Sequence, residues 1–212
     1  MNSSMILYSN SLYSSPYALS AYATLVEKGL PFELVTIDLS SGEHREARYT
    51  ALSLTSRIPT LVSGDFSLSE SSAIIEYLED TYTAPDFKSV FPHDVQQRAR
   101  ARQIQAWVRS DLGALREERQ TTVIYGDKNP APLSQQGRLA ADRLLSVADR
   151  LIDDQGGPLF GEWSIADVDF SVMLNRLHAN GDPVPDKVKR YVDQQSSRPC
   201  VESWWRMARG AR

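Results

Sequence analysis

The sequence predicts two domains of different class, an α/β domain at the N-terminus followed by an all-α helical domain. Three observations lead to this prediction. A strand–helix–strand pattern opens the chain, a hairpin pattern follows at residues 60–68, and no β pattern is found beyond a proline-bearing stretch at residues 84–92. A chain of 212 residues is long enough for one or two such domains.

The opening pattern contains two β-prone runs, Met5–Tyr8 and Phe32–Ile37, on either side of a helical pattern. Pro16 fits the first turn of this helix, with Ser15 as its N-cap, and Gly29 fits the position just past its end. Strand, helix and strand in this order predict a parallel strand pair joined by a right-handed crossover.

The segment from Arg57 to Leu78 is predicted to complete the first domain. Thr60–Leu68 has the pattern of a hairpin, and Pro59 must precede its first strand because proline cannot donate to a ladder. Ser69 is predicted to open a helix with one apolar face. A βαβ unit followed by a hairpin and a helix is a thioredoxin-like arrangement. We therefore expect a thioredoxin-like domain over residues 1–83.

The second domain is expected over residues 93–212, after a linker at residues 84–92. One long helix is predicted from His93 to about Gln120, and another over Ser134–Asp153. A closing amphipathic helix carries Trp204 and Trp205, which we interpret as packing anchors.

Ser164 and Asp167 have the spacing of a capping box at the start of a further apolar helix. Ser164 and Asp167 are therefore predicted to have a structural role rather than a catalytic one. A capping box stabilises the start of a helix, and each cap contributes about 1 kcal/mol to stability.

Composition argues against several classes of function. The net charge is −4, and the densest basic run, Arg98–Arg102, fits a solvated helix face, so nucleic-acid binding is not expected. The single cysteine, Cys200, excludes a disulfide within the chain. No apolar run is long enough to span a membrane, and no secretory signal is evident. We therefore expect no membrane partner and a cytoplasmic location. His93 and His178 lack metal-ligand spacing, and no metal is expected.

Two features near the hairpin could bind a ligand. Ile58 precedes a proline, which favours an extended backbone whose N–H and C=O could pair with an extended peptide. The helix start at Glu70–Ser71 offers backbone N–H groups and a hydroxyl to a carboxylate, and Glu70 offers an acceptor to an ammonium. A small peptide with an amino-acid head would fit both. The alternative is a hairpin capped onto a helix without a ligand.

A third feature is the hydroxyl of Ser15 at a predicted helix N-terminus. The positive end of a helix lowers the pKa of a thiol held nearby, and a serine hydroxyl could donate to the resulting thiolate. The alternative is that Ser15 is only an N-cap.

The residues Arg57–Leu61 followed by Glu70–Leu78 resemble the glutathione-binding half of a glutathione S-transferase. In that family the proline is cis, the residue before it pairs with the cysteinyl backbone of glutathione, and an acid–serine pair holds the γ-glutamyl head. The resemblance assigns these roles to Pro59, Ile58 and Glu70–Ser71.

The resemblance extends to two further segments of the first domain. His44 resembles the family position that contacts the glycyl carboxylate of glutathione. Ser15-Pro16-Tyr17 resembles the Ser-Pro-aromatic pattern of the serine-type transferases, which implies Ser15 as the thiolate-stabilising residue, with Ser14 as the alternative and Tyr8 as a third choice.

Residues 69–74 and 98–107 also resemble bacterial transferases of the YfcF type. The resemblance implies an enzyme of detoxification or oxidative stress that activates glutathione for attack on a small electrophile or a peroxide. It also implies a homodimer formed through the helix after Glu70 and the helix after His93. The residues proposed to contact the second substrate are Tyr13, Trp107, Ser110, Asp111 and Arg116.

Two alternatives stay open at this point. One is a non-catalytic interaction module with the same fold, although such modules often lose the residues of the glutathione site. The other is a glutathione-dependent isomerase of the zeta type. Its motif pairs serines with a cysteine, and this chain has Pro16 where that cysteine would fall.

Overall fold

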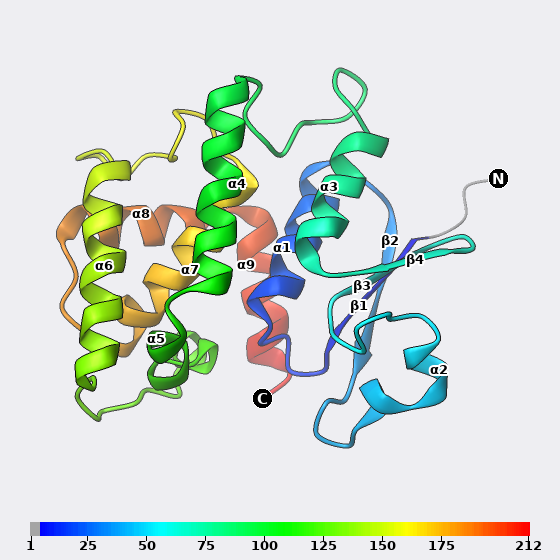
Figure 1. Cartoon of the computed structure of the whole chain (residues 1–212), viewed down its shortest axis with the longest axis horizontal. Helices are drawn as coiled ribbons and strands as arrows, with labels where there is room; N and C mark the ends of the chain where they lie inside the picture. The colour runs from blue at the N-terminus through cyan, green and yellow to red at the C-terminus, as the bar shows by residue number, and fades with distance from the viewer. Residues whose placement is uncertain (1–4) are drawn as a thin grey trace. The chain divides into compact units, whose positions relative to one another are not determined.

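A computed structural model describes residues 5–212, and the chain divides into two compact units (Figure 1). The first unit combines Met1–Val90 with Ser203–Arg212, and the second comprises Phe91–Glu202. These boundaries differ from the predicted ones, since most of the predicted linker and the end of the last helix belong to the first unit.

Buried polar contacts explain both differences. The ammonium group of Lys28 donates to the carbonyls of Tyr82, at 2.8 Å, and Lys88, at 3.0 Å, and it pairs with Glu79 at 2.7 Å. These bonds fasten the predicted linker to the first unit. At the other end of the chain, the indole N–H of the fully buried Trp204 donates to the carbonyl of Tyr13 at 2.8 Å.

The first unit is built on one mixed sheet of four strands with the order β2-β1-β3-β4. The strands are β1 (Met5–Asn10), β2 (Phe32–Ile37), β3 (Thr60–Ser63) and β4 (Phe66–Ser69). Strand β1 pairs in parallel with β2 and antiparallel with β3, which in turn forms a hairpin with β4. The predicted βαβ unit and hairpin are therefore confirmed.

Two helices of the first unit, α1 (Pro16–Glu27) and α3 (Ser71–Thr81), pack against each other and against the sheet (Figure 1). Their apolar side chains form one core with the strands. The prediction that Ser69 opens the second of these helices is wrong. Ser69 pairs with Thr60 as the last residue of β4, and Glu70 lies between strand and helix as the N-cap.

The connection from β2 to β3 carries only a 3₁₀ turn at Glu43–Arg45 and the short helix α2 (Ala47–Thr50).

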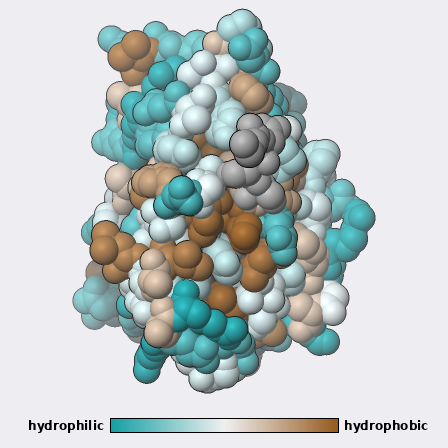
Figure 2. All heavy atoms as spheres, turned by 90° about the vertical axis from the view of Figure 1, so that its right-hand side faces the viewer, coloured by the Kyte–Doolittle hydropathy of each residue, from teal (hydrophilic) through white to brown (hydrophobic). Residues whose placement is uncertain are grey.

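Figure 2 views the molecule from the right-hand side of Figure 1, where the strands lie. Apolar side chains gather near the middle of this view, and hydrophilic side chains lie above and below them.

The second unit is helical. Its elements are α4 (Val95–Ser110), α5 (Gly113–Glu118), a 3₁₀ helix at Thr121–Tyr125, α6 (Gln135–Leu151), α7 (Ile165–Asn180), α8 (Asp186–Ser196) and the start of α9 (Pro199–Gly210). Helix α7 is almost entirely buried and packs against α4, α6 and α8. Along residues 5–212, no helix is both long enough and apolar enough to cross a membrane.

One prediction for this unit is wrong, and one helix was missed. The single helix expected from His93 to Gln120 is broken at Asp111 and Leu112, because Leu112 has a left-handed backbone (φ 60°) and the Asp111 carboxylate accepts its N–H. Helix α8 was not predicted, although Val188, Tyr191 and Val192 recur at the i, i+3 and i+4 spacing of a buried helical face.

The predicted capping box at the start of α7 is confirmed. The buried carboxylate of Asp167 accepts hydrogen bonds from the backbone N–H groups of Ser164 (2.8 Å) and Leu159 (2.9 Å) and from the hydroxyl of Tyr191 (3.0 Å). Burial raises the pKa of this carboxyl, and the hydrogen bonds act in the opposite direction. One side chain therefore ties together the start of α7, the loop before it and α8.

We predict that Asp167→Asn lowers the free energy of unfolding by about 1–3 kcal/mol. Each carboxylate oxygen faces a backbone N–H, so the amide nitrogen of asparagine would leave one buried donor unsatisfied whichever way it turns. Urea unfolding measures the change. Asp142→Asn, on the exposed face of α6, is the matched control and should change stability by less than about 0.5 kcal/mol. Equal midpoints for Asp167→Asn and wild type would contradict this account.

Candidate functional site

The register of the sheet gathers four distant segments at one end of the first unit. Tyr8 of β1 pairs with Thr60, and Thr60 pairs with Ser69, so β1 and β4 both end where β3 begins. Asn10 pairs in parallel with Ile37, so β2 ends there too. The loop after β1, the loop after β2, the turn before β3 and the start of α3 therefore share this end.

The turn before β3 presents an open backbone. The Ile58–Pro59 peptide bond is cis, as the family resemblance implies. Among residues 5–212, neither the N–H nor the C=O of Ile58 has a hydrogen-bond partner. Ile58 is half-buried, so this open donor and acceptor can be reached by an extended ligand and pair with its backbone.

Three hydroxyl groups fix the residue just before that open backbone. The carbonyl of Arg57 lies within hydrogen-bond distance of the hydroxyls of Tyr49 (2.8 Å), Ser53 (3.0 Å) and Thr60 (3.1 Å). Tyr49 is buried, and burial raises the pKa of its hydroxyl, so it keeps its proton and donates. Sequence reasoning missed this group, because nothing in the spacing of these residues predicts that they converge on one carbonyl.

Glu70 and Ser71 follow directly on the neighbouring strand. Glu70 is exposed and has a positive φ of 76°, an unusual conformation for a residue other than glycine. Its side chain does not cap the helix, so the carboxylate is available to a ligand. Ser71 is the first residue of α3 and is buried. Together they offer the acceptor and the helix-terminal donors that the sequence predicted.

The loop after β1 brings Ser14 and Ser15 to the start of α1. Ser15 is the N-cap, as predicted, and its hydroxyl oxygen accepts the N–H of Ala18 at 3.2 Å. Ser14 is bound differently, because the side-chain amide of Asn10 donates to its hydroxyl oxygen at 2.9 Å. The same amide accepts the backbone N–H of Ser15 at 3.2 Å. Asn10 was not among the predicted site residues.

The middle of this loop is held by the end of the chain. Tyr13 has a left-handed backbone (φ 49°), and its carbonyl accepts the indole N–H of Trp204. The two rings also make an edge-to-face contact, with centroids 5.5 Å apart. The prediction that Trp204 is a packing anchor is confirmed, and it anchors the loop that carries both serines.

His44 lies in the 3₁₀ turn that follows β2. Its Nε2 accepts the side-chain Nε–H of Arg45 at 3.2 Å, so a neutral ring carries its proton on Nδ1. Nδ1 is buried and has no partner among the described residues. The histidine thus holds one unpaired but buried nitrogen, and the carboxylate contact that the resemblance assigns to it stays a prediction.

The residues predicted to contact a second substrate lie in two places. Tyr13 belongs to the loop just described. In the second unit, Asp111 accepts the indole N–H of Trp107 at 3.0 Å and pairs with Arg143 at 2.7 Å. Hydrogen bonds from the N–H of Leu112, then from these two side chains, lower the pKa of Asp111.

The other two predicted residues are bound to backbone carbonyls. Arg116 donates to the carbonyls of Val108 and Asp111, and the exposed Ser110 donates to that of Ala106. Arg116 therefore holds together the break between α4 and α5.

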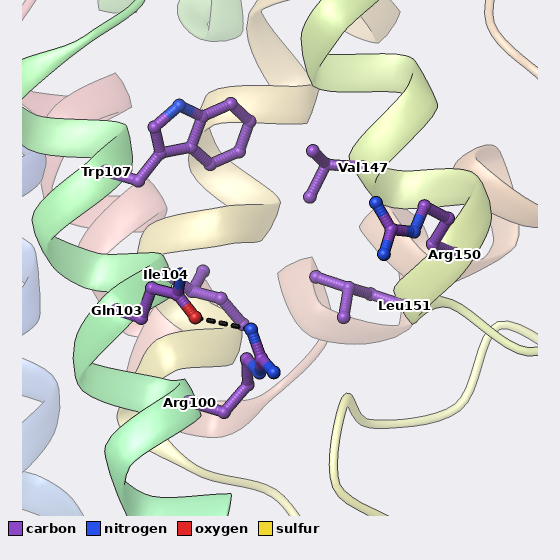
Figure 3. A pocket seen from close by; sticks show the side chains of 7 residues that line it. All are labelled: Arg100, Gln103, Ile104, Trp107, Val147, Arg150 and Leu151. Carbon is purple, nitrogen blue, oxygen red and sulfur yellow. Dashed lines mark hydrogen bonds between the residues drawn. The ribbon is translucent and has the colours of Figure 1, made fainter.

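A pocket of about 410 Å3 lies between α4 and α6 (Figure 3). It is lined by Arg100, Gln103, Ile104, Trp107, Val147, Arg150 and Leu151. Val147 and Leu151 point from α6 towards the side chains of α4, and Arg100 donates to Gln103 at its rim. Trp107 is the one predicted second-substrate residue among those lining this pocket.

Comparison with protein families agrees with the geometry. The model of the glutathione S-transferase N-terminal domain matches residues 14–81, and that of the C-terminal domain matches residues 94–209. Both segments of the predicted architecture are therefore recognised independently.

Individual relatives agree. Human glutathione S-transferase theta-2 is 32% identical over 141 residues, which is 64% of this chain but only 57% of the human enzyme. Mouse glutathione S-transferase theta-3 is 30% identical over 87% of this chain and 74% of its own length. Since these relatives are of the theta class, the resemblance to YfcF-type transferases stays a prediction.

Among solved structures, a glutathione transferase homologue from Burkholderia GL BGR1, with bound glutathione, is 46% identical to this chain. It matches with a TM-score of 0.79 over 98% of this chain and 99% of its own. The family models together cover most of the chain, and the fold, with its thioredoxin-like and helical units, is the one expected of them. The chain belongs to the glutathione S-transferase family.

Proposed function

We propose that the protein is a glutathione transferase, which binds glutathione in its first unit and activates the thiol for attack on a small electrophile or a peroxide. The observation that carries this proposal is the set of hydrogen-bonding groups gathered at one end of the sheet. The Ile58 backbone and the Glu70 carboxylate are unused among residues 5–212, and Ser14 and Ser15 at the start of α1 each accept a hydrogen bond while keeping a hydroxyl proton to donate. The Burkholderia homologue, which is solved with glutathione, supports the same ligand.

Each part of a glutathione molecule finds a complementary group. The cysteinyl N–H and C=O pair with the Ile58 backbone in the manner of an added strand. The carboxylate of the γ-glutamyl head accepts hydrogen bonds from the N-terminal N–H groups of α3. The ammonium of the same head pairs with the carboxylate of Glu70. The glycyl carboxylate is assigned to His44, whose imidazole would have to turn to bring the buried Nδ1–H to a ligand.

This arrangement would put the cysteinyl sulfur near the start of α1. The partial positive charge of a helix N-terminus lowers the pKa of a thiol, and a hydroxyl of Ser14 or Ser15 donates to the thiolate. The thiolate then attacks the electrophilic carbon and displaces its leaving group. With a peroxide, the thiolate attacks one peroxide oxygen, the O–O bond breaks, and the other oxygen leaves as an alkoxide that is protonated to the alcohol or water. The sulfenic acid formed on glutathione then condenses with a second glutathione to the disulfide and releases water.

We propose a cytoplasmic enzyme of detoxification or oxidative stress. The proposed contacts for the second substrate are Tyr13, Trp107, Ser110, Asp111 and Arg116. Trp107, Ser110, Asp111 and Arg116 all make hydrogen bonds within the second unit.

We predict that Glu70→Gln weakens glutathione binding by about 1.5–3 kcal/mol, or about 10- to 100-fold in Kd. The amide keeps the shape of the side chain but loses the charge that faces the ammonium. Titration calorimetry measures the change. Asp80→Asn, at the exposed far end of α3, is the control for loss of one negative charge and should leave Kd unchanged. If the wild type itself binds no glutathione, the interaction-module alternative takes the place of this proposal.

We predict that Tyr49→Phe raises the Kd for glutathione about fivefold, the equivalent of one net hydrogen bond of about 1 kcal/mol. The Arg57 carbonyl loses one of its three hydroxyl partners, and the Ile58 backbone next to it becomes less well fixed. Tyr191→Phe, which removes an equally buried hydroxyl from the second unit, should leave Kd unchanged. Equal effects of the two variants would argue against a local role.

We predict a homodimer with a mass about twice 23.7 kDa. The resemblance implies pairing through α3 and α4, and closed two-fold dimers are the commonest oligomers. Tyr77 of α3 contacts the exposed Phe66, with ring centroids 5.1 Å apart, which provides apolar surface in this region. Sedimentation equilibrium over a dilution series tests the prediction, and a mass of 23.7 kDa at micromolar concentration would refute it.

A further inference from the structure

We propose that Asn10 is the residue that positions the Ser14 hydroxyl, so that Ser14 donates its proton to the sulfur of bound glutathione. This inference rests on the proposed function and adds to it the origin of the hydroxyl's direction. It assigns a role to a buried amide that neither the sequence motifs nor the family resemblance singled out.

Asn10 is well placed to fix the loop. It is the last residue of β1, is 6% exposed, and pairs with Ile37 of β2. Its backbone carbonyl accepts the N–H of Tyr13 at 3.0 Å. The side chain therefore starts from a rigid strand end, and its amide reaches across the loop to Ser14 and Ser15.

The orientation of this amide follows from its partners. A backbone N–H can only donate, so the atom facing the N–H of Ser15 must be the amide oxygen. The atom facing Ser14 is then the amide nitrogen, which can only donate. Ser14 is thereby compelled to accept, and its own proton must point elsewhere.

No acceptor for that proton is found among residues 5–212. A hydroxyl that already accepts a hydrogen bond is polarised and becomes a better donor to a further partner. At the start of α1, the acceptor in need of such a donor is the thiolate of the proposed complex. Ser15 differs, because its oxygen is engaged by the helix itself as the N-cap.

Asn10 can be tested through the ionisation of bound glutathione. The thiolate absorbs in the ultraviolet, and its titration in the complex gives the pKa of the thiol. We expect Ser14→Ala and Asn10→Ala each to raise this pKa by about one unit, and Ser15→Ala to change it less. The double variant Asn10→Ala with Ser14→Ala should match Ser14→Ala alone, because Asn10 acts through Ser14.

Asn10→Asp provides the sharper variant, because it keeps the shape and still accepts the N–H of Ser15. The second carboxylate oxygen would accept the proton of Ser14, which reverses their hydrogen bond, and would add a negative charge near the sulfur. We therefore expect a larger rise in pKa than with Ser14→Ala. Gln155→Glu, an exposed site in the second unit, adds the same charge elsewhere and should cause no shift.

Two results would overturn the proposal. One is a pKa of bound glutathione in Asn10→Asp that equals the wild-type value, and the other is a double variant whose shift is the sum of the shifts in Asn10→Ala and Ser14→Ala. Either result would leave Asn10 with the structural role of holding the loop. If Asn10→Ala fails to fold, the near-isosteric Asn10→Asp still decides between these results. Absence of glutathione binding by the wild type in calorimetry would instead be a failure of the proposed function.

Discussion

The register of the four-stranded sheet is the constraint on which the rest of the first unit depends. Because Tyr8, Thr60 and Ser69 lie side by side on adjacent strands, the ends of β1 and β4 and the start of β3 coincide. The parallel pairing of β1 with β2 adds the loop that carries His44. A slip of one residue would turn the apolar side chains of a strand away from the core, so the same packing that stabilises the sheet also fixes the site.

Polar side chains then fix each loop in place. The hydroxyls of Tyr49, Ser53 and Thr60 hold the Arg57 carbonyl, the amide of Asn10 holds the two serines, and Trp204 holds Tyr13. Unpaired polar groups are costly inside a protein, so these bonds favour one loop conformation over others. The groups left open, at Ile58 and Glu70, are those that suit a peptide ligand.

The sequence was sufficient for what local chemistry determines. Strand β2, the N-cap at Ser15 and the capping box at Asp167 follow from periodicity and cap residues, and the structure has them where predicted. The resemblance implied the ligand contacts, which spacing alone left open. What sequence reasoning missed depends on local backbone conformations that residue types do not determine. The break at Leu112 needs a left-handed residue other than glycine, and Asn10 gains its role only because the loop after β1 turns back and brings Ser14 and Ser15 to its amide. Helix α8 is different, since its spacing was visible in the sequence.

The central claim is that glutathione binds across these loops as a thiolate held at the start of α1. A crystal structure of the complex tests it most directly. The account predicts the cysteinyl backbone paired with Ile58, the γ-glutamyl head at Glu70 and Ser71, and the sulfur within hydrogen-bond distance of the Ser14 hydroxyl. Glutathione bound elsewhere, or bound here with its sulfur turned away from both Ser14 and Ser15, would contradict it.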